Sequence, residues 1–159
     1  MSSLAEVFNG SNKFYGECYR AVEEKGKTKK KKLTAVKEGE PPFQQHLNKQ
    51  TKLGLFPFTD ERSVGFGAID IDDYNCKHKE IIKKLKELEI RASVAKSTNG
   101  GCHIYFLFDK PELASNIRMR LDMIATAIGY PGVEVFPKQD LFNPRWNPKA
   151  NKGKGGWKG

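Results

Sequence analysis

The stretch that decides the fold is VGFGAIDIDDY, residues 64–74, in which an apolar run closes with three aspartates. Side chains alternate between the two faces of a strand, so Asp70 and Asp72 share one face while the isoleucines beside them point into the core. Like charges at neighbouring positions on one face repel unless a cation lies between them, and Mg²⁺ or Mn²⁺ suits carboxylate oxygens. An alternative stays open, in which the strand ends in solvent and Asp72 or Asp73 caps the following helix.

Downstream of this strand, helical and strand patterns alternate. The predicted elements are a helix over residues 76–90, strands over 91–97 and 102–109 joined by the turn STNGG, a helix over 110–130 and a strand over 132–138. The order is βαββαβ, the ferredoxin-like plan of RNA-recognition modules and polymerase palms, in which both helices cover one face of a four-stranded antiparallel sheet. The predicted fold class is therefore α+β, an α/β sandwich, whose second sheet face is free for a ligand.

Each predicted helix has one apolar face. In the first helix this face consists of Ile81, Ile82, Leu85 and Leu88. In the second it consists of Leu113, Ile117, Leu121, Ile124 and Ile128. The proline at position 111 suits a first helical turn, so we expect the second helix to begin there.

The composition is that of a folded, basic protein. With 159 residues, 38% hydrophobic and 30% charged, the chain suits one domain with a core, or one piece of a larger protein. Its formal net charge of +9 favours a polyanionic partner, with nucleic acid first and an anionic membrane surface second. The chain shows neither a secretory leader nor a run approaching the roughly 18 apolar residues of a membrane helix, so we expect a cytoplasmic, unanchored protein.

Two basic segments flank a more balanced middle. KGKTKKKKLTAVK, residues 25–37, holds seven lysines, and residues 143–159 add one arginine and four lysines without an acid. The lysine run suits a solvated hairpin turn between GECYRAV and KLTAVK, with a direct phosphate contact as the alternative. We expect an N-terminal α/β subunit with a Lys-rich loop over residues 1–60, an RNA-recognition-like palm over residues 61–140 and a flexible basic tail over residues 141–159.

Two further features accompany the aspartates. Glu134 interrupts the apolar strand GVEVF, and if it faces the same side as the aspartates, three carboxylates could hold the metal ions of a phosphoryl-transfer site. In AKSTNGGCH, residues 95–103, a serine and two glycines make a tight turn whose backbone N–H groups can approach phosphate oxygens. His103 could donate to the same anion, and Lys96 and Lys138 could add positive charge.

The cysteines form no familiar disulfide or zinc pattern. Cys18, Cys76 and Cys102 are an odd, widely spaced set without a CxxC pair, and we interpret them as reduced thiols. Cys76 with His78, and Cys102 beside the following histidine, could be metal ligands, but these short spacings are poor for a closed tetrahedral site. The sequence therefore does not predict a zinc module.

Three motifs, taken in order, resemble those of the archaeo-eukaryotic primases, the primase-polymerase superfamily. They are IDIDD as an hDhD motif, STNGGCH as a small-x-His motif with a serine six positions before the histidine, and VEV as a late acidic motif. The chain is most similar to the branch found in mobile-element and conflict-system proteins, which includes TOTE-like and CRISPR-associated primase-polymerases. The resemblance covers about residues 43–140 and includes His46, which stands at a matching family position.

The resemblance implies a nucleotidyltransferase, a DNA primase or polymerase that uses two Mg²⁺ or Mn²⁺ ions and no organic cofactor. The implied catalytic and metal-binding residues are Asp70, Asp72 and Glu134. The implied residues around the triphosphate of an incoming NTP or dNTP are Ser97, Gly101 and His103, with Lys138 as a helper and Lys96 as a neighbouring charge. A DNA template and a DNA or RNA primer would be held by the basic flanks. Since the sequence stops at NKGKGGWKG, we expect helicase, nuclease, CRISPR-type or priming-accessory regions to belong to a larger protein.

Two other classes of function remain open. A non-catalytic RNA-recognition-like module fits the fold pattern and the charge, but CHIYFLF and VGFGAIDI lack the aromatic signature that such modules use to stack bases. A metal-dependent nuclease is compatible with the carboxylates. A rolling-circle initiator on a similar fold would need two histidines flanking one apolar residue and a nucleophilic tyrosine, and the sequence offers only one strand histidine, His103. The turn STNGGCH discriminates between these classes, because it suits a triphosphate and has no use in a nuclease.

Overall fold

The computed structural model describes residues 3–20, 32–97 and 100–142. They fall into two compact units, of which the first consists of residues 3–10 and Pro57–Phe142 and the second of Ser11–Phe56. The lysine-rich turn within residues 21–31 and the basic tail from residue 143 lie outside the described residues. The predictions of a solvated turn or a phosphate contact for the lysines before residue 32, and of a flexible tail from residue 143, are therefore not addressed by the structure.

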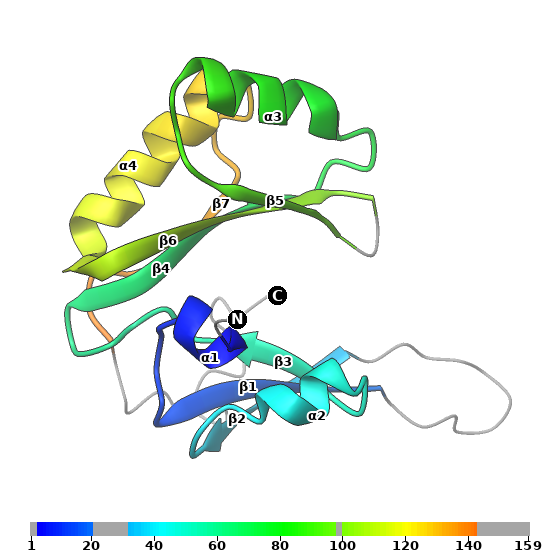
Figure 1. The fold of residues 1–159 in the computed structure, drawn as a ribbon, viewed down its shortest axis with the longest axis vertical. Coiled ribbons are helices and arrows are strands. Elements are labelled where there is room, and N and C mark those ends of the chain that lie inside the picture. The colour runs from blue at the N-terminus through cyan, green and yellow to red at the C-terminus, as the bar shows by residue number, and fades with distance from the viewer. Residues whose placement is uncertain (1–2, 21–31, 98–99, 143–159) are drawn as a thin grey trace, which may run out of the picture. The chain divides into compact units, whose positions relative to one another are not determined.

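The second unit is a small antiparallel sheet with one short helix (Figure 1). Strands β1 (Phe14–Arg20), β2 (Lys32–Glu38) and β3 (Lys52–Leu55) pair in the order β2-β1-β3, and helix α2 (Phe43–Leu47) precedes β3. The predicted pairing of GECYRAV with KLTAVK is confirmed, since Gly16 lies opposite Val36 and Glu17 opposite Ala35.

The first unit contains the predicted βαββαβ order. Its elements are α1 (Leu4–Val7), β4 (Ser63–Ile71), α3 (His78–Glu87), β5 (Ser93–Lys96), β6 (Cys102–Leu113), α4 (Ala114–Ala127) and β7 (Glu134–Phe136). The strands form one antiparallel sheet in the order β5-β6-β4-β7, so the first strand of the motif lies between the third and the fourth. Helices α3 and α4 cover one face of this sheet (Figure 1), which confirms the α+β class and the ferredoxin-like core.

The core of this unit lies between the sheet and the two helices. Alternation along β4 sends Ile69 and Ile71 to the helix side, where both are buried. The other side chains of this core come from α3, β6, α4 and β7, and include Ile81, Leu85, Ile104, Ile117, Leu121 and Val135. Gly67 lets α4 approach β4 closely, because a Cβ there would lie 2.9 Å from Leu121 Cδ1. The packed face of β4 thereby fixes which residues point the other way.

The other face of the sheet is partly covered by the N-terminal segment. Ser3 caps α1 through a reciprocal capping box with Glu6. The ring of Phe8, which follows this helix, packs edge-on against Phe66 at 5.4 Å and against Tyr105 at 5.3 Å between ring centroids. This face is therefore lined with aromatic rings along part of its length.

Two details differ from the predicted helices. Pro111 and Leu113 belong to the end of β6 rather than to a helix, and α4 begins at Ala114. The extension pairs with the start of β4 beyond a register shift, where Leu113 lies opposite Ser63. Pro111 falls in the register shift between Leu107 and Glu112, and the pairing of β5 with β6 ends at Tyr105, so none of the described strand pairings requires an N–H donor at this position.

The predicted apolar face of the first helix is also narrower than expected. Ile81 and Leu85 are buried, whereas Ile82 is 38% exposed and Leu88 is 46% exposed. Two side chains four residues apart suffice to cover this part of the sheet, so the flanking positions remain at the surface. None of the helices in the described part of the chain combines the length and the apolar character needed to cross a membrane.

Candidate active site

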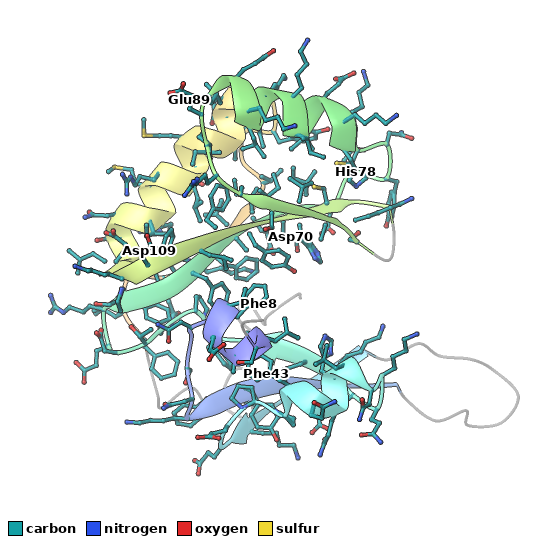
Figure 2. The ribbon with its side chains drawn as sticks, in the orientation of Figure 1. Phe8, Phe43, Asp70, His78, Glu89 and Asp109 are labelled. Carbon is teal, nitrogen blue, oxygen red and sulfur yellow. The ribbon has the colours of Figure 1, made fainter. Side chains whose placement is uncertain are left out.

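Three of the predicted site residues form a row across neighbouring strands. Asp70 on β4 lies opposite His103 on β6 and opposite Glu134 on β7. Residues directly opposite each other in an antiparallel pair project from the same face, so all three point away from the helices. Figure 2 shows Asp70 on the face of the sheet opposite α3 and α4. The register therefore brings together an imidazole and two carboxylates that are far apart in the sequence.

Along β6, the side chains of His103 and Tyr105 follow one another on the same face as Asp70. His103 Nε2 lies 3.1 Å from Asp70 Oδ1, and His103 Nδ1 lies 3.3 Å from the Tyr105 hydroxyl. Burial first, and then the nearby Asp70 carboxylate, raise the pKa of Tyr105, so its hydroxyl stays protonated beside His103 Nδ1. The ring of His103 therefore lies between the Tyr105 hydroxyl and the Asp70 carboxylate.

One carboxylate oxygen of Asp70 lacks a hydrogen bond in the described part of the chain. Its Oδ1 is buried, and within the described residues no hydrogen bond reaches it. The nearby His103 Nε2 is at ion-pair distance but without hydrogen-bond geometry. A buried carboxylate oxygen left in this way is costly unless a charged group completes its shell. This oxygen, together with Glu134 across the strand, fits a hard divalent cation, for which carboxylate oxygens are the preferred ligands.

Glu134 has a cationic neighbour of its own. Lys138 Nζ lies 2.9 Å from Glu134 Oε2 and 4.9 Å from the centre of the Phe136 ring. The side chains of the lysine and the glutamate are 32% and 46% exposed, so this pair is reached by solvent. The predicted helper lysine therefore lies beside one of the predicted metal ligands.

Asp72 does not join the row. Strand β4 ends at Ile71, and Asp72 follows it as an exposed residue. The alternative of a helix cap is wrong, because α3 has Lys77 at its N-cap without a side-chain hydrogen bond. Asp73 instead accepts a hydrogen bond from the Asn75 backbone N–H at 2.9 Å, which closes an Asx turn.

The turn between β5 and β6 lies next to the row. The Ser97 N–H donates to Gly101 O at 2.9 Å, and the Gly100 N–H donates to Ser97 O at 3.1 Å, which closes the turn. A Cβ at Gly101 would lie 2.2 Å from Ile71 O, so only glycine permits this approach to the end of β4. Lys96 is the exposed last residue of β5. Ser97 and Gly101 thus lie together, two residues beyond the row.

Two residues of this face were not selected from the sequence. Tyr105 follows His103 by two positions in a strand, so strand periodicity alone places it on the same face. Phe8 gave no such signal, because its contact with the sheet joins residues far apart in the chain. His46, which matches a family position, lies in α2 of the other unit, where its Nδ1 is 3.2 Å from Thr51 O.

A comparison with protein families identifies the class to which this geometry belongs. The family described as the archaeo-eukaryotic primase domain of TOTE conflict systems matches residues 9–147. The chain belongs to this family, and the resemblance found in the three motifs is confirmed. Membership supports a primase-type nucleotidyltransferase function in general, with nucleic acid and nucleotides as substrates. No curated protein matches the chain.

Proposed function

We propose that this chain is the catalytic domain of a DNA primase-polymerase, which transfers a nucleotidyl group from an NTP or dNTP to a 3′-hydroxyl on a template. The observation that carries the proposal is the cross-strand row, in which Asp70 and Glu134 are direct neighbours. The buried Asp70 oxygen without a hydrogen bond adds to it. A purely structural role does not explain why two acids occupy one row of a sheet.

The carboxylates are the proposed ligands of Mg²⁺ or Mn²⁺. Asp70 and Glu134 would hold the ions from neighbouring strands, and Asp72 would join them from the segment that follows β4. When bound, two such ions activate the attacking hydroxyl and neutralise the charge on the leaving pyrophosphate. The rigid β4–β7 pairing fixes the two carboxylates in advance, so little reorganisation is needed at the moment of reaction.

The proposed contacts of the triphosphate are His103 and the residues of the β5–β6 turn, with two lysines nearby. His103 stands on the other side of Asp70 from Glu134, and Tyr105 orients its ring. Ser97, Gly101 and Lys96 lie in or beside the turn that meets the same end of β4. Lys138 would leave the Glu134 carboxylate and turn to a phosphate once cations occupy the site. The cationic groups of the site would then neutralise the polyanionic substrate.

The proposal is tested by extension of a labelled primer on a DNA template, with NTPs and dNTPs supplied separately and with Mg²⁺ or Mn²⁺. Wild-type protein should extend the primer, and Asp70→Ala and His103→Ala should each abolish extension. Asp109→Asn is a matched control, since it removes an exposed carboxylate farther along β6. An unprimed template then shows whether the chain also starts strands.

Two outcomes would contradict the proposal. Shortening of the labelled DNA in a manner that depends on Asp70 would assign the carboxylates to a nuclease. Retention of extension in Asp70→Ala would remove the row from the mechanism. A third outcome, in which nucleic acid binds while neither metal nor triphosphate does, would favour the RNA-recognition-like module.

A further inference from the structure

A second cluster of donor atoms lies on the helix side of the sheet. The sulfur atoms of Cys76 and Cys102 and a ring nitrogen of His78 all lie within 4.8 Å of one another. Cys76 belongs to the connection after β4, His78 is the first residue of α3, and Cys102 is the first residue of β6. Figure 2 shows His78 at the start of α3, on the other side of the sheet from Asp70.

We propose that Cys76, His78 and Cys102 form a binding site for one zinc ion. Two thiolates and an imidazole are borderline-soft donors that select zinc over Mg²⁺ or Mn²⁺. Sulfur ligands about 2.3 Å from a tetrahedral ion lie roughly 3.8 Å apart, so a cluster confined within 4.8 Å needs only a small contraction. The fourth position is left to water or to a group of a ligand.

The protein holds these three donors in place without an ion. His78 Nε2 lies 3.0 Å from Gly101 O. In the proposed site Nδ1 would therefore bind the ion, since a zinc-bound histidine commonly gives its other ring nitrogen to a backbone carbonyl. The Cys76 N–H donates to Asp73 O at 3.0 Å, which fixes the short connection that carries the thiol. Cys102 is fully buried in the apolar core, so its sulfur cannot turn away to solvent. The site is therefore largely preformed.

An ion that binds this cluster must displace the thiol protons. Burial first, and then the neighbouring Cys76 thiol, raise the pKa of Cys102 to about 12. A buried thiol beside a second thiol is thus a neutral group, and a bound cation exchanges its charge for the thiol protons. The zinc would tie the connection after β4 and the start of α3 to β6. That connection also carries Asp72, so the proposed ion braces a segment beside the carboxylate row.

Cobalt titration of the full chain tests this proposal directly. Metal-stripped, reduced protein receives Co²⁺, and the thiolate-to-cobalt charge-transfer absorption is followed until it saturates. We expect saturation at one equivalent and loss of the band when Zn²⁺ is added. Removal of a group that only hydrogen-bonds to a ligand costs about 10–100-fold in metal affinity, so Cys76→Ser and His78→Asn should each cost at least about 100-fold.

Matched variants separate this site from other sources of the same signal. Cys18→Ser and His46→Asn each remove a thiol or an imidazole from the other unit, and the band should persist in both. Asp70→Asn should also keep it, because the carboxylate row is not part of this site. Absence of the band in wild-type protein would overturn the proposal, as would a band that survives both Cys76→Ser and His78→Asn. Because Cys102 is buried and its replacement can unfold the core, the two half-buried ligands carry the test.

Discussion

The two faces of one pair of strands offer different chemistry. On β6 the neighbouring residues Cys102 and His103 point to opposite sides, as do Ile71 and Asp70 on β4. The helix side receives sulfur and imidazole donors, and the other side receives carboxylates, an imidazole and a phenol. Strand alternation separates Cys102 from His103, while Cys76 and His78 reach the helix side from the connection after β4 and from α3. The proposed soft site and the proposed hard site thus share a backbone without sharing a ligand.

The two faces also differ in how many hydrogen bonds their polar side chains receive. The Cys76, His78 and Cys102 cluster is held by hydrogen bonds to Gly101 and Asp73 and by the core. In the carboxylate row, a buried Asp70 oxygen has no hydrogen bond within the described part of the chain. A site built to keep its ion needs a preformed cage, whereas a catalytic site must accept ions together with substrate. The comparison predicts that variants act on one face at a time, unless they alter the shared backbone.

The largest effect should come from Asp70→Asn. The change preserves shape but removes the charge at the centre of the row, and loss of several kcal/mol of metal-dependent stabilisation corresponds to about 10³-fold or more in the rate of primer extension. The measurement is kcat/KM for a dNTP at saturating metal. Cobalt absorption by the thiolate cluster should stay unchanged. Equal loss of both signals would mean that the two faces are one site.

Gly101→Ala should damage both faces together. Its Cβ would overlap Ile71 O on the neighbouring strand, and strain of this kind in a packed site typically costs about 1–3 kcal/mol. Chemical denaturation measures the loss of unfolding free energy. Gly54→Ala is the control, because a Cβ there meets its nearest atom at 3.5 Å, an ordinary contact. A fully stable Gly101→Ala protein would show that the ends of β4 and β6 separate more easily than the structure implies.

Lys138→Gln should have a small effect on stability and a selective effect on nucleotide. Solvent-exposed ion pairs contribute about 0–1 kcal/mol, so the loss of the contact with Glu134 should leave the unfolding free energy nearly unchanged. If the lysine turns to a phosphate, KM for the nucleotide rises while primer affinity holds. Lys83→Gln is the matched control, since Lys83 forms a similar exposed pair with Glu87 on α3. A fall in stability with unchanged KM would make Lys138 structural.

The smallest effect should come from Asp60→Ala. The Asp60 carboxylate lies before β4 and has hydrogen-bond partners of its own. It accepts hydrogen bonds from the Arg62 and Ser63 N–H groups at 2.8 and 2.7 Å, and these hold the pKa of Asp60 below its ordinary value. Its stabilisation is therefore present above the unfolded pKa of about 4 and is lost as pH falls below it. Asp60→Ala should flatten this acid limb in thermal unfolding at a series of pH values. An unaltered limb would assign the acid sensitivity to other carboxylates.

The sequence predicts the palm well because its signals are local. Alternation along residues 63–71 and helical spacing in α3 and α4 require only a period of two or of 3.6 residues. The same period placed Asp70 on the free face of its strand, and it applies equally to His103 on β6. Their common row depends on register, which core packing of Ile69 against Ile104 and Val135 decides.

What the sequence could not predict depends on contacts across distance. Spacing along the chain argued against a zinc site, because the cysteines are widely spaced without a CxxC pair, and Cys76 and Cys102 each lie too close to the neighbouring histidine. The pairing of Ile71 with Cys102 brings the connection that carries Cys76 next to the start of β6. The start of α4 was predicted too early, because Pro111 reads as a helix start until the extended pairing of β6 with β4 is known. Alternation predicted Asp72 on the same face as Asp70, but β4 ends one residue before Asp72.

The alternation that separates the two faces also restricts how the gene can change. Deletion of the Ala68 codon would shift the remaining part of β4 by one residue. Ile69 and Ile71 would then turn outward and Asp70 inward, so the core and the carboxylate row would be lost in the same event. Substitutions can be sampled one face at a time, but insertions and deletions in β4 and β6 cannot. We expect length variation among related genes to fall in the connections and not in these two strands.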